Sequence, residues 1–92
     1  MLDELLILKK IKEGDIKAFE ELFRRYYFPL CCYAAGITGQ MAVAEEIVEE
    51  LFYVLWKERE RLQIFQSVKS YLYRATRNQS LQYCEHEEVR NR

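Results

Sequence analysis

The sequence predicts an all-α domain, a compact bundle of about four helices. Four segments carry apolar residues at three- and four-residue steps, which is the period of one face of an α-helix. No segment combines alternating apolar residues with a tight-turn pair, so nothing indicates a β-hairpin. Gly14, Gly36 and Gly39 fall where the helical patterns pause, and we therefore expect them to separate helices.

The first helix is expected over residues 2–12, with Gly14 as its stop. Asp3 and Glu4 lie at its beginning, where negative side chains favour the positive end of the helix dipole.

The second helix is expected to begin after Asp15, an N-cap residue, and to continue to about Ala35. Pro29 lacks an amide proton and disfavours helical geometry at the residue before it, so we expect a kink or a local break there. The segment 36–39, with two glycines, should end the helix.

The third helix should run from Gln40 or Met41 to a charged cluster at residues 57–61. Its apolar face comprises Ala44, Ile47, Val48, Leu51, Phe52 and Leu55. A segment without a clear period, residues 62–66, precedes Ser67, which we expect to cap the fourth helix. The core side of that helix comprises Val68, Tyr71, Leu72 and Ala75. Its charged end, residues 85–92, should fray or continue into a segment that follows.

The composition favours a soluble binding domain. The 92 residues are 50% hydrophobic and 32% charged, which is too apolar for disorder and too charged for a membrane span. A chain of this length forms one small core and is too short for a catalytic cleft between two lobes. Acids precede the first apolar run, unlike a secretory signal, so we expect a cytoplasmic location.

The cysteines and the histidine predict neither a disulfide nor a metal site. Cys31 and Cys32 are adjacent, Cys84 is the odd third, and His86 lies two residues beyond it, which matches no zinc-ligand spacing. No nucleophile–histidine grouping or phosphate-binding loop is present either. We therefore expect no cofactor, no metal and no enzymatic activity.

One side of the third helix is acidic. At about 100° per residue, five residues share an arc of about 140° opposite the apolar stripe. They are Glu45, Glu46, Glu49, Glu50 and Tyr53. Like charges at these spacings repel one another by a few tenths of a kcal/mol per pair, roughly, and a cationic partner would relieve that repulsion. We interpret the arc as a protein-docking surface with Tyr53 as its anchor; the alternative is a solvated helix surface.

The fourth helix repeats this arrangement with the opposite charge. Its polar arc comprises Lys69, Ser70, Tyr73, Arg74 and Arg77, and Asn78 adds a neutral polar group. Basic side chains bind phosphates, and aromatic rings stack on bases. In the preceding segment Gln63, Phe65 and Gln66 could receive an unstacked base. The alternatives are a solvated basic surface and, for the apolar residues of the segment, closure of the core.

Three blocks of the sequence resemble a known family. They are DIKAFEELFRRYYFPL at residues 15–30, AEEIVEELFYVLW at 44–56 and SVKSYLYRATRN at 67–78. In this order and at these intervals they resemble region 2 of bacterial sigma-70 type sigma factors, specifically the extracytoplasmic-function group. The resemblance spans nearly the whole chain. It implies a single region 2 domain over residues 1–92, from the N-terminal part of a longer chain that also carries a helix-turn-helix region 4.

The resemblance also implies partners and roles. Region 2 docks on the clamp helices of the largest catalytic subunit of core RNA polymerase, and it recognises and melts the minus-ten element of promoter DNA. Docking would fall to Glu46, Glu49, Glu50 and Tyr53. The family usually has Asp-x-x-Gln-Glu where this chain has Glu46, Glu49 and Glu50, so Glu49 is the clearest departure.

The DNA contacts implied by the resemblance lie on the segment before the fourth helix and on that helix. They are Gln63, Phe65, Gln66, Ser67, Lys69, Ser70, Tyr73, Arg74, Arg77 and Asn78. The resemblance leaves an anti-sigma factor open as a further partner. The alternative from a different class is a helical protein-interaction adaptor that binds no nucleic acid.

Overall fold

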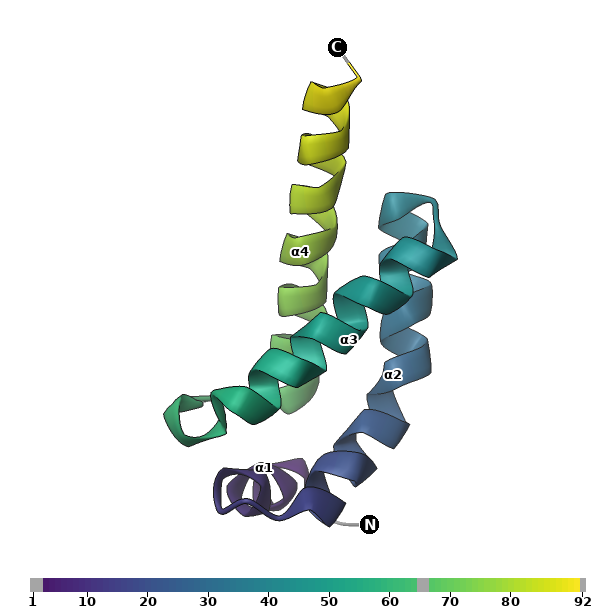
Figure 1. The fold of residues 1–92 in the computed structure, drawn as a ribbon. Helices are drawn as coiled ribbons and strands as arrows, with labels where there is room; N and C mark the ends of the chain where they lie inside the picture. The colour runs from purple at the N-terminus through teal and green to yellow at the C-terminus, as the bar shows by residue number, and fades with distance from the viewer. Residues whose placement is uncertain (1–2, 65–66, 92) are drawn as a thin grey trace.

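The computed structural model describes residues 3–64 and 67–91, and this part of the chain is helical with no strand. It comprises α1 (Glu4–Lys12), α2 (Ile16–Thr38), α3 (Met41–Lys57), the short 3-10 helix η1 (Arg59–Arg61) and α4 (Val68–Arg90) (Figure 1). The predicted all-α fold with four principal helices is confirmed.

Side-chain caps fix the beginnings of three helices. Asp15 Oδ1 accepts hydrogen bonds from the amides of Lys17 and Ala18, at 3.0 and 3.2 Å. Ser67 caps α4 in the same way, as predicted. Asp3 adopts an extended conformation and caps α1, so that helix begins at Glu4, later than we expected. The reason is that a capping residue lies outside the helix that it caps.

α2 is one continuous helix through Pro29, so the expected local break is absent, although its axis changes direction along its length in Figure 1. The fixed φ of proline suits a helix, and the buried residue Leu30 holds the following turn in the core. The helix continues to Thr38, past the expected end at about Ala35. It ends at Gly39, within the segment 36–39 that we predicted to end it. The φ of Gly39 is 77°, the left-handed conformation that glycine adopts without strain.

The core forms where α2 packs against the other helices. Ile11 of α1, Leu22 and Leu30 of α2, and Leu72 of α4 are all fully buried. Phe52 of α3 is 1% exposed, and its ring contacts those of Phe19 and Phe23 on α2, with centroids 6.1 and 5.0 Å apart. Each fully buried side chain of this size contributes about 1.5–3 kcal/mol of transfer free energy.

α4 buries a different set of residues from the one that we predicted. Its buried residues recur at steps of four: Val68, Leu72, Thr76 and Ser80. Tyr71 and Ala75, which we expected on the core side, are only half-buried. Thr76 and Ser80 are polar, so a search for apolar periodicity passes over them. Within the described residues their hydroxyl groups have no hydrogen-bond partner.

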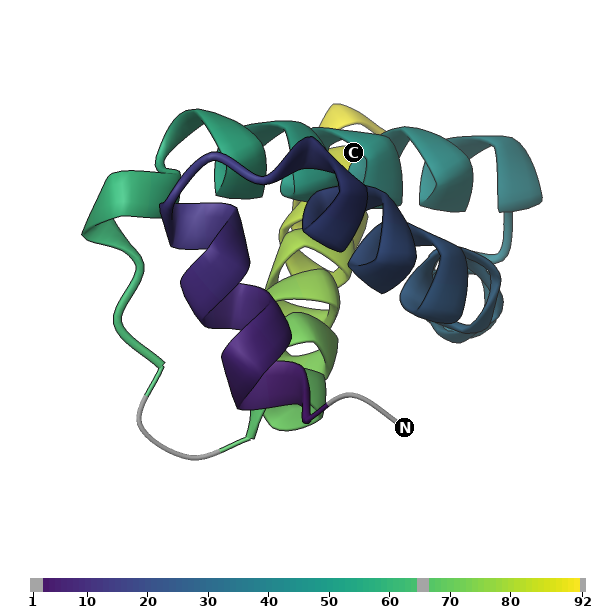
Figure 2. The same cartoon turned by 90° about the horizontal axis from the view of Figure 1, so that it is seen from below.

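The C-terminal half of α4 extends past the ends of α2 and α3 (Figure 1). The charged segment, which we expected to fray or to continue into a segment that follows, is helical to Arg90. Figure 2 shows α1 lying across the end of the bundle next to the beginning of α4. The bundle therefore has a closed end at α1 and an open end along the last turns of α4.

Candidate functional site

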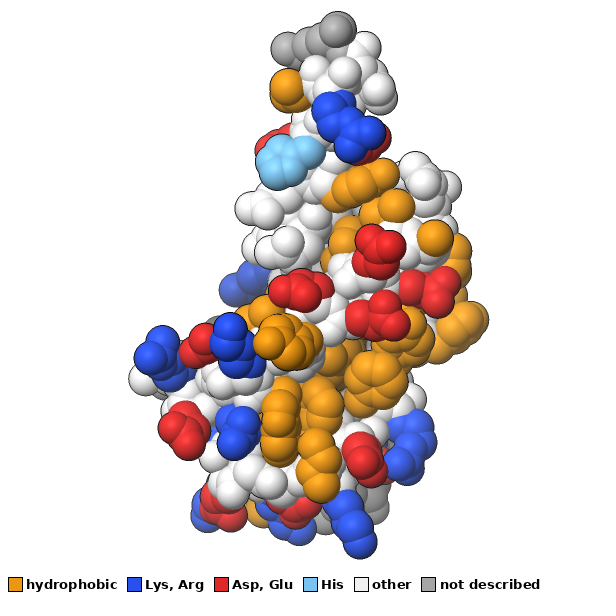
Figure 3. All heavy atoms as spheres, viewed as in Figure 1, with side chains coloured by type: hydrophobic (Ala, Val, Ile, Leu, Met, Phe, Trp, Pro, Cys, Tyr) orange, Lys and Arg blue, Asp and Glu red, His pale blue; other side chains and the backbone are white. Residues whose placement is uncertain are grey.

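The glutamates of α3 and Tyr53 form one exposed surface, which we call the acidic face: Glu45, Glu46, Glu49, Glu50 and Tyr53. Figure 3 shows the acidic side chains gathered over α3. Tyr53 is 59% exposed, and the Lys57 ammonium lies 5.9 Å from its ring centroid. Among the ion pairs of residues 3–64 and 67–91, none involves these four glutamates. The face therefore presents four negative charges that the described chain does not neutralise.

Aromatic side chains of α2 and α3 border the acidic face on one flank. The Trp56 ring packs against Phe19 at 5.1 Å between centroids, and the Arg59 guanidinium lies 4.3 Å from the Trp56 centroid. Burial raises the pKa of the Tyr27 hydroxyl to about 12, with smaller contributions from the Cys31 thiol and from the Glu49 and Glu45 carboxylates. The Tyr27 ring stacks on that of Phe23, with centroids 4.7 Å apart, so it belongs to this aromatic flank.

A second surface on α4, the basic face, comprises Lys69, Ser70, Arg74, Arg77 and Asn78. All five residues are exposed, as predicted. The three cations form no ion pair with the described residues, whereas Arg24, Arg25, Arg61 and Arg90 all do. The basic face is therefore free to bind anionic groups.

Tyr73 does not belong to the open part of this face. Its ring contacts that of Tyr33 on α2, with centroids 5.1 Å apart and an edge-to-face geometry, and the residue is half-buried. Our prediction that Tyr73 lies opposite the core is wrong, because α2 packs along that side of α4. Only part of the ring is accessible to a ligand.

The segment between η1 and α4 is described only in part. Leu62 is buried and Ile64 is half-buried, so both help to close the core, while Gln63 is exposed and remains available for binding. The predicted DNA contacts Phe65 and Gln66 lie outside the described residues. Ser67 caps α4 and lies at the edge of the basic face.

Sequence reasoning missed two lysines near this segment. Lys9 and Lys12 of α1 border an open cavity of about 420 Å³ whose other walls include Leu5, Leu8 and Ile64. The signal was weak, because these lysines also suit the last turn of a helix. Glu13 lines the same cavity, so the two lysines bring one net positive charge to the end of the bundle at which Gln63 lies.

The described residues hold no group of three or more metal-ligating side chains, and none of their helices combines the length and hydropathy needed to cross a membrane. All three cysteines are free thiols. Burial raises the pKa of Cys31, so its thiol stays protonated and packs as a small apolar group.

Comparisons with known proteins agree with the arrangement of these helices. The family model for Sigma-70 region 2 matches residues 22–88. A search of curated proteins found no match. Among solved structures, the chain is similar to an engineered region 2 of sigmaE, determined by NMR in complex with GTAAAA. The TM-score is 0.80 at 21% identity, over 97% of this chain and 93% of the other, which shows a common fold.

Proposed function

This chain belongs to the sigma-70 region 2 family, and from that premise we propose that it acts in transcription initiation, where it docks on core RNA polymerase and recognises and melts the minus-ten promoter element. The observation that carries the proposal is the separation of charge over two helices. α3 presents acids that the described chain leaves unpaired, and α4 presents cations that it leaves unpaired.

For polymerase docking, we assign Glu46, Glu49, Glu50 and Tyr53 to the clamp helices of the largest catalytic subunit. The exposed carboxylates suit a cationic partner, and Tyr53 offers a large ring that can be buried on binding. Glu49 places a charge where the family usually has an amide, so this chain should depend more on electrostatic attraction than a typical member does.

For promoter binding, we assign Lys69, Arg74 and Arg77 to phosphates of the melted strand. Gln63, Ser67, Ser70 and Asn78 are exposed polar residues that can reach bases or sugars nearby. Tyr73 has a smaller role than we expected, because Tyr33 covers part of its ring. The complex of the similar sigmaE domain with GTAAAA supplies a suitable probe for this chain.

The docking assignment can be tested by reversing the charge of Glu46, Glu49 and Glu50 to lysine. Loss of each exposed attraction costs about 0.5 kcal/mol, and the new repulsion costs about as much again. Binding to core RNA polymerase should therefore weaken by about 3 kcal/mol, or about a hundredfold in Kd. Biolayer interferometry at fixed ionic strength measures this change.

A triple variant with lysine at Glu13, Glu60 and Glu85 is the matched control, because these residues are exposed and lie outside the acidic face. It should bind polymerase as the wild type does. Unchanged binding of the first variant would refute the docking assignment. Equal weakening of both variants would show that net charge, rather than the acidic face, determines binding.

A further inference from the structure

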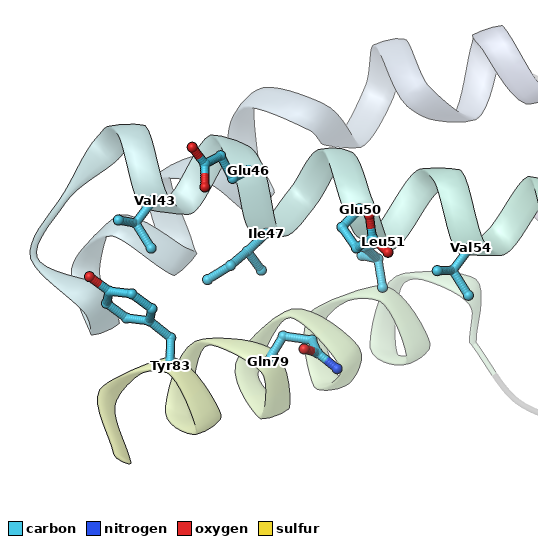
Figure 4. A pocket seen from close by; sticks show the side chains of 8 residues that line it. All are labelled: Val43, Glu46, Ile47, Glu50, Leu51, Val54, Gln79 and Tyr83. Carbon is cyan, nitrogen blue, oxygen red and sulfur yellow. The ribbon is translucent and has the colours of Figure 1, made fainter. Parts of the chain in front are cut away.

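The basic face has a flank on either side, because α4 packs against both α3 and α2. On the α3 flank an open groove encloses a cavity of about 410 Å³, and Figure 4 shows Gln79 and Tyr83 of α4 facing Ile47 and Leu51 of α3 across it. We predicted Ile47 and Leu51 to lie on the core face, but both are only half-buried. The reason is that α3 and α4 separate toward the end of α4 (Figure 1).

The two flanks differ in charge. Glu46 and Glu50 line the groove on the α3 flank, where they would repel the phosphates of a DNA strand. On the other flank, the part of α2 that follows Arg25, residues 26–38, contains no charged residue. A strand that is bound by the basic face should therefore continue over α2 rather than over α3.

Tyr33 lies where α2 meets α4 on this uncharged flank. It is 36% exposed, and its ring contacts the Tyr73 ring edge to face, with centroids 5.1 Å apart. An edge-to-face contact uses the edge of one ring and a single face of the other, so it leaves ring surface uncovered. Because Tyr33 is the more exposed of the two residues, most of the accessible aromatic surface of the pair belongs to α2.

Two cations of the basic face lie beside this pair of rings. Lys69, Tyr73 and Arg77 follow one another at steps of four residues, so they share one side of α4 and are about 6 Å apart along the helix axis. Lys69 and Arg77 are exposed and form no ion pair with the described residues. This order of cation, ring and cation suits a nucleotide whose base stacks while the neighbouring phosphates are bound.

We propose that Tyr33 stacks on one unpaired base of the promoter strand, at a site that it shares with Tyr73, while Lys69 and Arg77 bind the phosphates on either side of that base. The proposal rests on the promoter binding proposed above. It extends the DNA-binding surface to α2, because every DNA contact that the family resemblance implies lies within residues 63–78.

The site should favour the melted strand over the duplex. A base inside a duplex is covered by its neighbours, and it must leave the stack before a protein ring can cover its face. Every base has such a face, so Tyr33 should add affinity for single-stranded DNA without selecting a particular base. Part of the cost of unpairing would thereby be offset by a residue of α2.

Tyr33→Ala tests the site with a fluorescein-labelled GTAAAA strand. Fluorescence anisotropy should show an affinity at least about fivefold lower than that of the wild type, because one stacked base is lost. The slope of log K against log salt should not change, because the ring neutralises no phosphate. Tyr33→Phe keeps the ring and should restore the binding.

Phe28→Ala is the matched control, because it removes another aromatic ring from α2. Phe28 is 68% exposed, and five residues separate it from Tyr33, which places the two side chains about 140° apart around the helix. Phe28→Ala should therefore bind the strand as the wild type does. Equal weakening by Phe28→Ala or by Tyr33→Phe would overturn the proposal, because the ring of Tyr33 would not be the cause.

Probes that lack a single base, each at a different position of GTAAAA, separate stacking from a change in structure. At the position that Tyr33 contacts, removal of the base should weaken binding to the wild type at least about fivefold and binding to Tyr33→Ala much less, because the stack is already lost. At the other positions both proteins should lose affinity equally. If Tyr33→Ala weakens the binding of every probe equally, the substitution disturbs the packing of α2 on α4, and the proposal is overturned.

The same assay separates this proposal from the proposed function. If the wild type binds GTAAAA and Tyr33→Ala binds it equally well, promoter binding stands and the Tyr33 site alone is overturned. If the wild type does not bind GTAAAA, promoter binding is refuted and the site with it.

Discussion

Replacing Lys69, Arg74 and Arg77 with alanine should weaken DNA binding and should also make that binding depend less on salt concentration. The three side chains are exposed and form no ion pair within the described residues, so their replacement breaks no internal contact of that kind. The effect of these side chains on binding should then come from their contacts with DNA phosphates, which release the counterions bound there. The fold should remain intact in the variant.

The magnitude follows from the number of cations. Each phosphate neutralised on a single strand adds about 0.7 to the slope of log K against log salt, so loss of three contacts flattens the slope by about 2. The ratio of the wild-type DNA-binding constant to that of the variant should therefore fall by about twentyfold between about 50 mM and about 200 mM salt. Fluorescence anisotropy with labelled GTAAAA measures both slopes.

A control removes the same charge elsewhere, with alanine at Lys17, Arg24 and Arg90, which are all exposed and outside the basic face. The ion pairs of Arg24 and Arg90 lie at the surface within one helix, so their loss costs little stability. Its slope should equal that of the wild type. If the slope of the basic-face variant is unchanged, these residues do not contact the phosphates, and the face is a solvated surface. If the control flattens the slope equally, the effect reflects overall charge and the assignment to α4 is refuted.

Two further predictions concern stability. Thr76→Val should raise the free energy of unfolding by about 1 kcal/mol and Tm by about 4 °C or more, because it removes a buried hydroxyl without a partner. Differential scanning calorimetry measures Tm, and a lower Tm in the variant would contradict this prediction. Thr38→Val is the control and should destabilise, since that hydroxyl donates to the Ala34 carbonyl at 3.0 Å. Burial, followed by the 2.6 Å hydrogen bond to Glu4, raises the pKa of Tyr26 to about 12. This contribution to stability is present below pH 10 and is lost as the pH rises toward 12, so urea unfolding of Tyr26→Phe should depend less on pH in that range; identical pH profiles would exclude the effect.

The sequence predicted the helices well, because local signals determine them. Asp15 and Ser67 cap their helices through hydrogen bonds to residues two or three positions away, and such contacts can be deduced from the sequence. The misplaced boundaries have the same local origin. Asp3 fits either a first helical turn or a cap, and Gly36 tolerates a helix as well as a turn.

Side-chain surroundings were harder to predict, because they depend on how the helices cross. Periodicity alone placed Tyr73 opposite the core. Its contact with Tyr33 joins residues forty positions apart in the sequence, and the period of one helix cannot predict such a contact. Thr76 and Ser80 are buried despite their polarity, which no hydropathy pattern reveals. The exposed members of both faces were predicted correctly, because charged side chains far from the core stripe remain in water whatever the crossing angles are.

Pro29 lies between residues of α2 that contact three different helices. Before it, Tyr26 is hydrogen-bonded to α1, and Phe23 packs on α3; after it, Tyr33 meets α4. Because proline donates no amide hydrogen bond, the Arg25 carbonyl has no partner in the helical ladder, and α2 can bend there without breaking one. Because α4 also contacts α1 and α3 directly, a bend at Pro29 would not move α4 freely, but would adjust how the second half of α2 packs against it.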